Sequence, residues 1–154
     1  MNPQRLKTIL TDLVACRDLQ AKELPNGELE TYCNLALLRV AVAFGCKDFA
    51  SVPNANTMCD LMQFAIDWTP GTGEQAQAWA DKGMLAVACK KAEGHGHVAA
   101  VCPADSMYFS PSLKKNVPWL ANVGKTNGIL PASRCFPVAE GEPSYFLWTG
   151  CSGY

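Results

Sequence analysis

The chain has 154 residues and a mass of 16.6 kDa, which suits one domain over residues 1–154. Hydrophobic residues make up 49% of the chain and charged residues 18%, so a folded core is expected and a disordered chain is excluded. Lys and Arg number 13 against 14 Asp and Glu, so there is no basic excess to neutralise phosphates, which argues against nucleic acid as a partner.

The first half of the chain has the apolar periodicity of helices. Breaks at Pro25-Asn26-Gly27 and at the Pro70-to-Gly73 segment separate the periodic stretches. We expect helices over about residues 5–23, 31–44, 57–66 and 74–81. The second of these is apolar almost all round, which predicts a central helix, and Thr31 is its expected N-cap.

The second half has the pattern of strands. We expect strands over residues 84–89, 97–102, 117–123, 133–138 and 145–149, and a loop over residues 103–116. Helices followed by strands predict an α+β fold, with a helical part of about residues 1–82 packed on an antiparallel sheet of about residues 83–154.

No membrane span is expected, because the longest apolar stretch, residues 35–44, is interrupted by Arg39 and is shorter than the ~20 residues that a span needs. The N-terminal segment contains Lys7 and Asp12 and lacks the unbroken apolar centre of a signal peptide. We therefore expect a protein made in the cytoplasm that stays there, or that leaves by lysis or by a dedicated machine.

Cysteine is abundant, but its spacing does not indicate zinc. The eight cysteines occupy positions 16, 33, 46, 59, 89, 102, 135 and 151. They form no Cys-x-x-Cys pair, and the chain has only two histidines, so we expect no metal site. Several of these cysteines are expected to be small buried apolar residues.

Cys33 is the candidate nucleophile. It falls in the first turn of the expected central helix, where unpaired N–H groups and the helix dipole favour an anion and therefore a thiolate. The alternative is an inert buried cysteine.

His97 is the candidate base for that thiol. It opens an expected strand between small residues, and strand alternation places it on the same face as Ala99 and Val101. The alternative is a structural histidine. A metal site made with His95 is disfavoured, because Glu93 is the one carboxylate close by in the sequence.

Asn122 is the candidate for the third residue, which would hold the imidazole by its other nitrogen. It is a polar residue within an apolar strand, where such a side chain either makes a specific hydrogen bond or faces solvent. Asn127, Asp105 and Ser106 are the competing candidates.

Three segments in this order resemble the papain-like cysteine peptidases that cut bacterial cell walls: Tyr32-Cys33-Asn34, Gly96-His97-Val98-Ala99-Ala100-Val101 and Asn122. These peptidases include the NlpC type, the CHAP amidases and, with the greatest similarity, the small type VI secretion amidase effectors. The loop Asn54-Ala55-Asn56-Thr57-Met58 and the strand over residues 83–88 are similar to segments of those effectors.

The resemblance implies a papain-like NlpC-type fold and a cysteine amidase that hydrolyses an amide in the peptide part of peptidoglycan. It implies Cys33, His97 and Asn122 as catalytic residues and no cofactor. It also implies that substrate is bound by Tyr32, Asn34 and Asn56. The bond that is cut stays open between D-glutamate–diaminopimelate and the diaminopimelate–D-alanine cross-link.

The same resemblance implies an antibacterial effector that acts in the periplasm of a target cell. Its partners would be peptidoglycan, the type VI secretion apparatus and a periplasmic immunity protein. The alternatives are a phage endolysin of the same fold and a catalytically inactive wall-binding or interaction module. In an oxidising periplasm a thiol pair is expected to close, and Cys16–Cys151 is the pairing we select.

Overall fold

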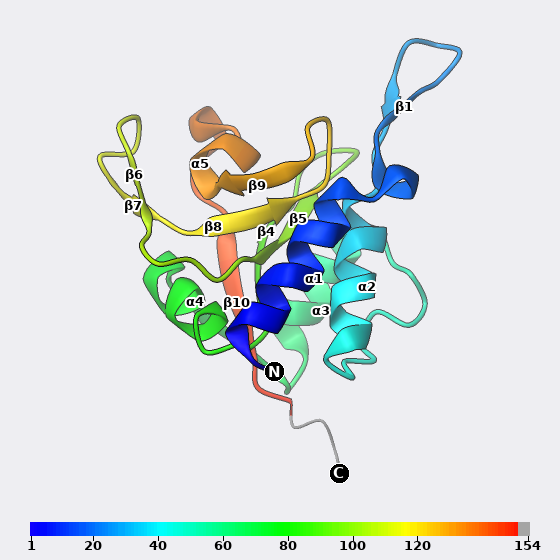
Figure 1. Cartoon of the computed structure of the whole chain (residues 1–154). Coiled ribbons are helices and arrows are strands. Elements are labelled where there is room, and N and C mark those ends of the chain that lie inside the picture. Colours follow the sequence, from blue (N-terminus) through cyan, green and yellow to red (C-terminus); the bar gives the residue numbers. More distant parts are fainter. Residues whose placement is uncertain (151–154) are drawn as a thin grey trace.

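A computed structural model describes residues 1–150 as an α+β fold in which helices cover both faces of a six-stranded antiparallel sheet (Figure 1). The strands, in spatial order, are β3 (Trp68–Gly71), β10 (Ser144–Trp148), β4 (Ala86–Lys90), β5 (His97–Val101), β8 (Trp119–Asn122) and β9 (Gly128–Pro131). The predicted α+β class is therefore confirmed.

The helices divide between the two faces of the sheet. One face is covered by α1 (Pro3–Ala15), α2 (Cys33–Ala43) and α3 (Ala55–Phe64). The other face carries α4 (Gly73–Ala80) and the short α5 (Ala132–Cys135). Two 3₁₀ turns complete the helical segments, η1 (Arg17–Leu19) and η2 (Val138–Glu140). The predicted packing of N-terminal helices on the sheet is confirmed.

Alternation along the strands separates two hydrophobic cores. In β5, Val98 and Ala100 join the core beneath α1, α2 and α3, whereas Ala99 and Val101 join the core beneath α4 and α5. All four side chains are buried, as expected for a central strand that is covered on both faces.

Helix α2 is central, as its apolar sequence predicts. Ala36, Leu37, Val40 and Ala41 are buried, and the helix packs against β5. Its small residues allow the helix to approach the Ala-rich strand closely. Cysteines contribute to the same packing: Cys33, Cys46, Cys59, Cys89 and Cys102 are buried, in agreement with their predicted role as small apolar residues.

The helix predicted over residues 5–23 is too long. Helix α1 ends at Ala15, and its buried face of Leu6, Leu10 and Leu13 would continue at residue 17, which is a charged arginine. The chain instead turns through η1, which buries Leu19, and enters a two-stranded arm formed by β1 (Lys22–Glu23) and β2 (Leu29–Glu30).

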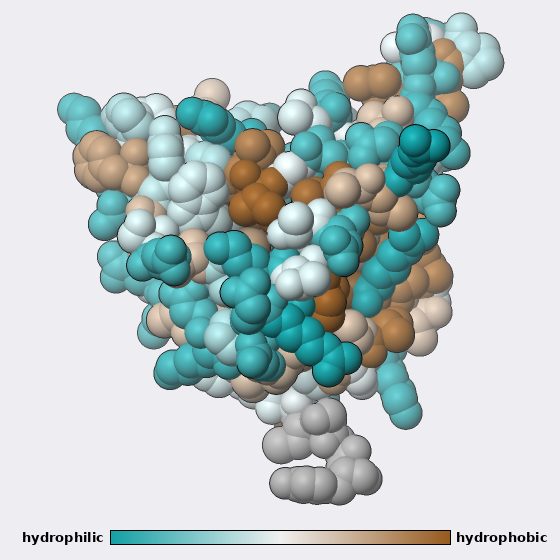
Figure 2. Space-filling model, viewed as in Figure 1, coloured by the Kyte–Doolittle hydropathy of each residue, from teal (hydrophilic) through white to brown (hydrophobic). Residues whose placement is uncertain are grey.

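The arm stands out from the body at the upper right of Figure 1, and Figure 2 shows that its surface carries both hydrophilic and hydrophobic side chains. Its turn depends on Gly27, which has a φ of +82° and therefore a conformation that other residues rarely adopt. The predicted break at Pro25-Asn26-Gly27 is confirmed, whereas the short strands on either side of it were not predicted.

The strand predicted over residues 133–138 is wrong, because this segment forms α5 and the start of η2. Pro131 precedes the helix, and Ala132 and Phe136, four residues apart, are both buried against the sheet. Pro137, which cannot donate to a strand ladder, then follows.

Other segments also differ from the prediction. The expected loop over residues 103–116 contains a small hairpin of β6 (Tyr108–Ser110) and β7 (Lys115–Val117), and Pro118 separates that hairpin from β8. Strand β3, from the part predicted to be helical, pairs with β10 at the edge of the sheet. No helix within residues 1–150 is both long and apolar enough to cross a bilayer.

We predict that Leu37→Ala, which opens a cavity between α2 and β5, lowers the free energy of unfolding by about 2–5 kcal/mol. Leu37 is 2% exposed. Val42→Ala on the same helix is the control, because Val42 is 64% exposed, and it should change stability by less than about 0.5 kcal/mol. Denaturant unfolding measures both variants, and equal losses would contradict the central position of α2.

Candidate active site

Cys33 is the first residue of α2, and the residue before it provides no side-chain cap for the helix. The N-cap is Tyr32, whose side chain makes no capping hydrogen bond, so the prediction of Thr31 as the N-cap is wrong. The N–H groups of the first turn are therefore not occupied by a capping side chain. They remain available to an anion that forms at this point.

Cys33 is buried, with 7% of the residue exposed. The backbone N–H groups of Val98, Asn34 and Cys33 itself face the sulfur, and each lowers its pKa. Burial outweighs them and raises the pKa of the thiol above its ordinary value. To act as a nucleophile, this thiol needs a base that takes its proton.

His97 and Asn122 are brought together across β5 and β8. The distance between His97 Nε2 and Asn122 Oδ1 is 2.7 Å, and Asn122 Nδ2 donates to the carbonyl of Thr126, also at 2.7 Å. Because the Asn122 amide nitrogen is used by that carbonyl, its oxygen faces His97, and an amide oxygen can only accept. Nε2 therefore carries the proton, and Nδ1 of the neutral ring keeps its lone pair.

The surroundings of His97 also favour the neutral ring. Burial lowers the pKa of His97, while the hydrogen bond with Asn122 opposes that shift. The ring of Phe136 lies 5.1 Å from the imidazole, centroid to centroid, and covers one side of it. His97 is thus held in place as a neutral imidazole, with Nδ1 free of hydrogen bonds from the described residues.

The thiol and the imidazole lie at the same end of β5. The sulfur lies near the backbone N–H of Val98, the residue that directly follows His97, and this N–H lowers the pKa of the thiol. Among residues 1–150 no hydrogen bond joins the sulfur to the imidazole itself. Catalytic hydrogen bonds are often long before substrate binds and tighten in its complex.

Two adjoining clefts open at this point. The first is about 430 Å³ and is lined by Cys33, while the second is about 570 Å³ and is lined by His97 and Asn122. Both clefts share Leu29, Thr31, His95 and Gly96. We call them the thiol cleft and the imidazole cleft. A substrate lying across Gly96 would contact both candidate catalytic side chains.

The three residues predicted to bind substrate have different surroundings. Asn34 and Asn56 line the thiol cleft, whereas Tyr32 lines neither cleft. The Tyr32 hydroxyl donates to Glu30 at 2.7 Å, and this hydrogen bond raises its pKa. Asn34 Nδ2 donates to the carbonyl of Pro53.

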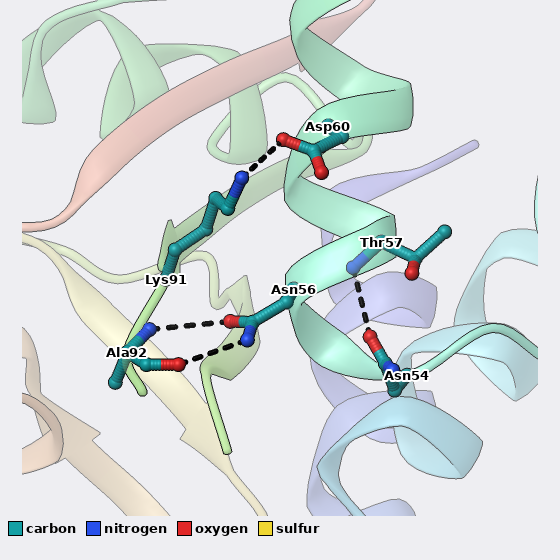
Figure 3. Close-up of polar contacts among 6 residues, drawn as sticks. All are labelled: Asn54, Asn56, Thr57, Asp60, Lys91 and Ala92. Carbon is teal, nitrogen blue, oxygen red and sulfur yellow. Dashed lines mark hydrogen bonds and ion pairs between the residues drawn. The ribbon is translucent and has the colours of Figure 1, made fainter. Parts of the chain in front are cut away.

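Asn56 clamps the turn between β4 and β5. Its amide makes two hydrogen bonds to the backbone of Ala92, at 2.9 and 3.2 Å, as Figure 3 shows. Nearby, Lys91 pairs with Asp60, and Asn54 caps α3 through the N–H of Thr57 (Figure 3). The clamp holds the segment that leads into His97 against the start of α3.

Gly96 is required by that clamp. A Cβ at this position would lie 2.2 Å from Asn56 Oδ1 and 2.8 Å from the carbonyl of Lys90, which is closer than real Cβ contacts allow. The glycine in the Gly-His pair thus lets the strand approach α3 and forms the floor between the two clefts.

The competing candidates for the third residue do not hold His97. Asn127 uses its amide to bind the N–H of Gly124 and the carbonyl of Leu19, so it organises the turn after β8. Asp105 and Ser106 are exposed and line neither cleft. His95 is exposed on the shared rim of the two clefts.

Several charged residues of the clefts were not predicted. Lys125 and Arg134 line the imidazole cleft, and Glu28 and Glu30 line the thiol cleft. Isolated surface charges carry no distinctive sequence signal, and Arg134 lies in the segment that was wrongly predicted to be a strand.

Within the described part of the chain, no three His, Cys, Asp or Glu side chains gather in a way that would hold a metal ion. The predicted Cys16–Cys151 pairing lies outside the described residues, because Cys151 follows residue 150. A comparison with models of known protein families and a search of curated proteins each found no match to this chain.

We predict that His97 titrates below the ordinary histidine value of about 6.5 and that Asn122→Ala lowers its pKa further. The reason for the second shift is that the lost hydrogen bond favours the protonated ring. NMR titration of the imidazole measures both midpoints, and nitrogen shifts identify the proton on Nε2.

Two controls accompany this titration. The urea-unfolded chain supplies the reference midpoint for His97, and the exposed Asn116→Ala should leave the folded midpoint unchanged. A His97 midpoint above the unfolded reference, or a neutral ring protonated on Nδ1, would contradict the described environment.

Proposed function

We propose that this chain is a cysteine amidase that hydrolyses an amide in the peptide part of bacterial peptidoglycan, and that its fold is of the papain-like NlpC type. One observation carries the proposal: the Thr126–Asn122–His97 hydrogen-bond chain leaves Nδ1 unprotonated at the end of β5 where the thiol of Cys33 lies. The order of these residues along the chain, and the similarity of their segments to cell-wall peptidases, support the same assignment.

In the proposed first step, His97 Nδ1 takes the thiol proton as Cys33 Sγ attacks the scissile carbonyl carbon. The C=O bond becomes a C–O⁻ bond, and the N–H of Cys33 at the open start of α2 helps to stabilise this oxyanion. One such donor is worth roughly 3 kcal/mol of the barrier. Asn122 keeps the ring oriented while it becomes positively charged.

In the second step the C–N bond breaks, and His97 gives its proton to the departing nitrogen. A thioester then joins the acyl half of the substrate to Cys33. Water attacks this thioester, His97 takes a proton from the water, and the sulfur leaves and recovers a proton from His97. These steps use the side chains of Cys33, His97 and Asn122, the backbone N–H of Cys33, and water.

We also propose that the amidase is an antibacterial effector of a type VI secretion apparatus that acts in the periplasm of the target cell. A producer of such an effector would need a periplasmic immunity protein that occupies the clefts around Cys33 and His97. The reason is that peptidoglycan is the proposed substrate and sister cells would receive the same protein.

We predict that Cys33→Ala and His97→Ala each abolish digestion of purified sacculi while the fold stays cooperative. Both residues act in the same proton transfer and attack, so the double variant should be little slower than either single variant. Product release measured by mass spectrometry gives the rates. More than a few per cent residual activity in Cys33→Ala would exclude it as the nucleophile.

Two further variants complete this series. Asn122→Ala should lose about 10- to 1,000-fold in rate, because it orients the base without making bonds itself. His95→Ala should keep most of the activity, since His95 is exposed on the rim. A dead His95→Ala with an active His97→Ala would reverse the two roles. A wild-type chain that binds sacculi without cleaving them would favour an inactive wall-binding module.

We predict that this chain is tolerated in a bacterial cytosol and lyses the cell when a signal peptide directs it to the periplasm, where peptidoglycan is accessible. Cys33→Ala with the same signal peptide is the matched control and should not lyse. Culture density after induction measures the effect. Equal toxicity in both compartments would contradict the cell-wall substrate and indicate a cytosolic one.

A further inference from the structure

The chemistry of the proposed site assigns each half of the substrate to one cleft. Cys33 keeps the acyl half as a thioester, so that half lies in the thiol cleft. His97 must reach the departing nitrogen to protonate it, so the leaving half lies in the imidazole cleft. This assignment rests on the proposed function.

The imidazole cleft is basic. Lys90, Lys125 and Arg134 line it, against a single acidic residue, Glu140. The two ion pairs found within residues 1–150 are Lys91–Asp60 and Lys115–Glu142, so none of the three cations of the cleft is in a direct ion pair with a described carboxylate.

Two of these cations are held in position. Lys90 Nζ donates to the backbone carbonyls of Glu140 and Gly141, which fixes its ammonium at the cleft wall. The Arg134 Cζ lies 5.7 Å from the centroid of the Tyr108 ring, a cation–π contact that restrains the guanidinium. A guanidinium with a free edge is suited to bind a carboxylate through two parallel hydrogen bonds.

The thiol cleft has the opposite charge. Its lining contains Glu28 and Glu30 and no lysine or arginine. A carboxylate on the acyl half would be repelled here, whereas a neutral acyl residue would not be. The two clefts together therefore favour an amide whose acyl residue is uncharged and whose leaving half bears a carboxylate.

The two candidate bonds of peptidoglycan differ in this respect. In the D-alanine–diaminopimelate cross-link, the acyl residue is an uncharged alanine, and the amine-bearing carbon of the leaving half carries a free carboxylate. In the γ-D-glutamate–diaminopimelate bond, the acyl residue itself carries a free α-carboxylate, and the carboxyl beside the leaving amine continues the peptide chain in a tetrapeptide stem.

We infer that this amidase cuts the D-alanine–diaminopimelate cross-link, and that Arg134 and Lys125 bind the carboxylate next to the leaving amine. The negative side of the site, at Glu28 and Glu30, disfavours the γ-D-glutamyl bond of the stem. Arg134 and Lys125 are specificity residues in this assignment, because they contact the leaving half and take no part in proton transfer.

The test uses purified muropeptides and the wild-type chain. The substrates are the cross-linked tetrapeptide dimer, the uncross-linked tetrapeptide monomer, and a dimer whose carboxylate beside the scissile amide is a carboxamide. We expect the dimer to yield monomers and the monomer to stay intact. The carboxamide dimer should react at least roughly tenfold more slowly than the carboxylate dimer. Mass spectrometry identifies each product.

Variants test the assigned residues. Arg134→Gln and Lys125→Gln should each raise the KM for the dimer by roughly 3- to 10-fold at low salt, with little change for the carboxamide dimer. Arg134→Lys should recover part of the loss. Lys82→Gln, which removes an exposed charge outside both clefts, is the control. Thermal unfolding checks that every variant is folded.

The outcomes separate this inference from the function on which it rests. Cleavage of the γ-D-glutamyl bond, or equal rates for the carboxylate and carboxamide dimers, overturns the inference while the amidase remains. An unchanged KM in folded Arg134→Gln and Lys125→Gln overturns the role of these residues. Cleavage of none of the muropeptides overturns the amidase and, with it, the inference.

Discussion

The close packing of α2 against β5 positions every other part of the site. It brings the first turn of the helix to the start of the strand, so the Cys33 sulfur lies near the N–H of Val98. Alternation in the same strand directs Val98 toward α2, while His97 turns to Phe136 and Asn122. The Cys33 thiol and the His97 imidazole thus lie on opposite faces of β5. A substrate bound at the start of this strand can contact both.

Packing this tight also dictates the charge state of the resting site. Burial raises the pKa of the Cys33 thiol and lowers that of His97, so the proton stays on sulfur and the ring stays neutral. The hydrogen-bond donors that oppose the first shift are backbone N–H groups, fixed by α2 and β5 themselves. They stabilise negative charge once it develops and need no rearrangement at that moment.

Sequence patterns predicted the parts of the fold that repeat with a regular period. The apolar sequence of α2 and the strand patterns of β5 and β8 predicted these three elements close to their observed bounds. Alternation in β5 placed Ala99 and Val101 on one face, and both side chains lie in the same core. The patterns failed where the secondary structure of a segment depends on its tertiary packing. Leu29 and Glu30 form a strand only because the arm folds on itself, and Ala132 and Phe136 form a helical face only against the sheet. Arg134 enters the imidazole cleft through that same helix, so its place could not be read from local sequence.

A thiol that remains protonated until substrate arrives is protected from oxidation. Peroxides and disulfides react with thiolates, and a buried neutral thiol presents almost none. Cys33 is 7% exposed and its sulfur is enclosed by α2 and β5. The burial that delays its deprotonation therefore also slows its oxidation to sulfenic acid, which would protect the thiol in the oxidising periplasm of the proposed target cell.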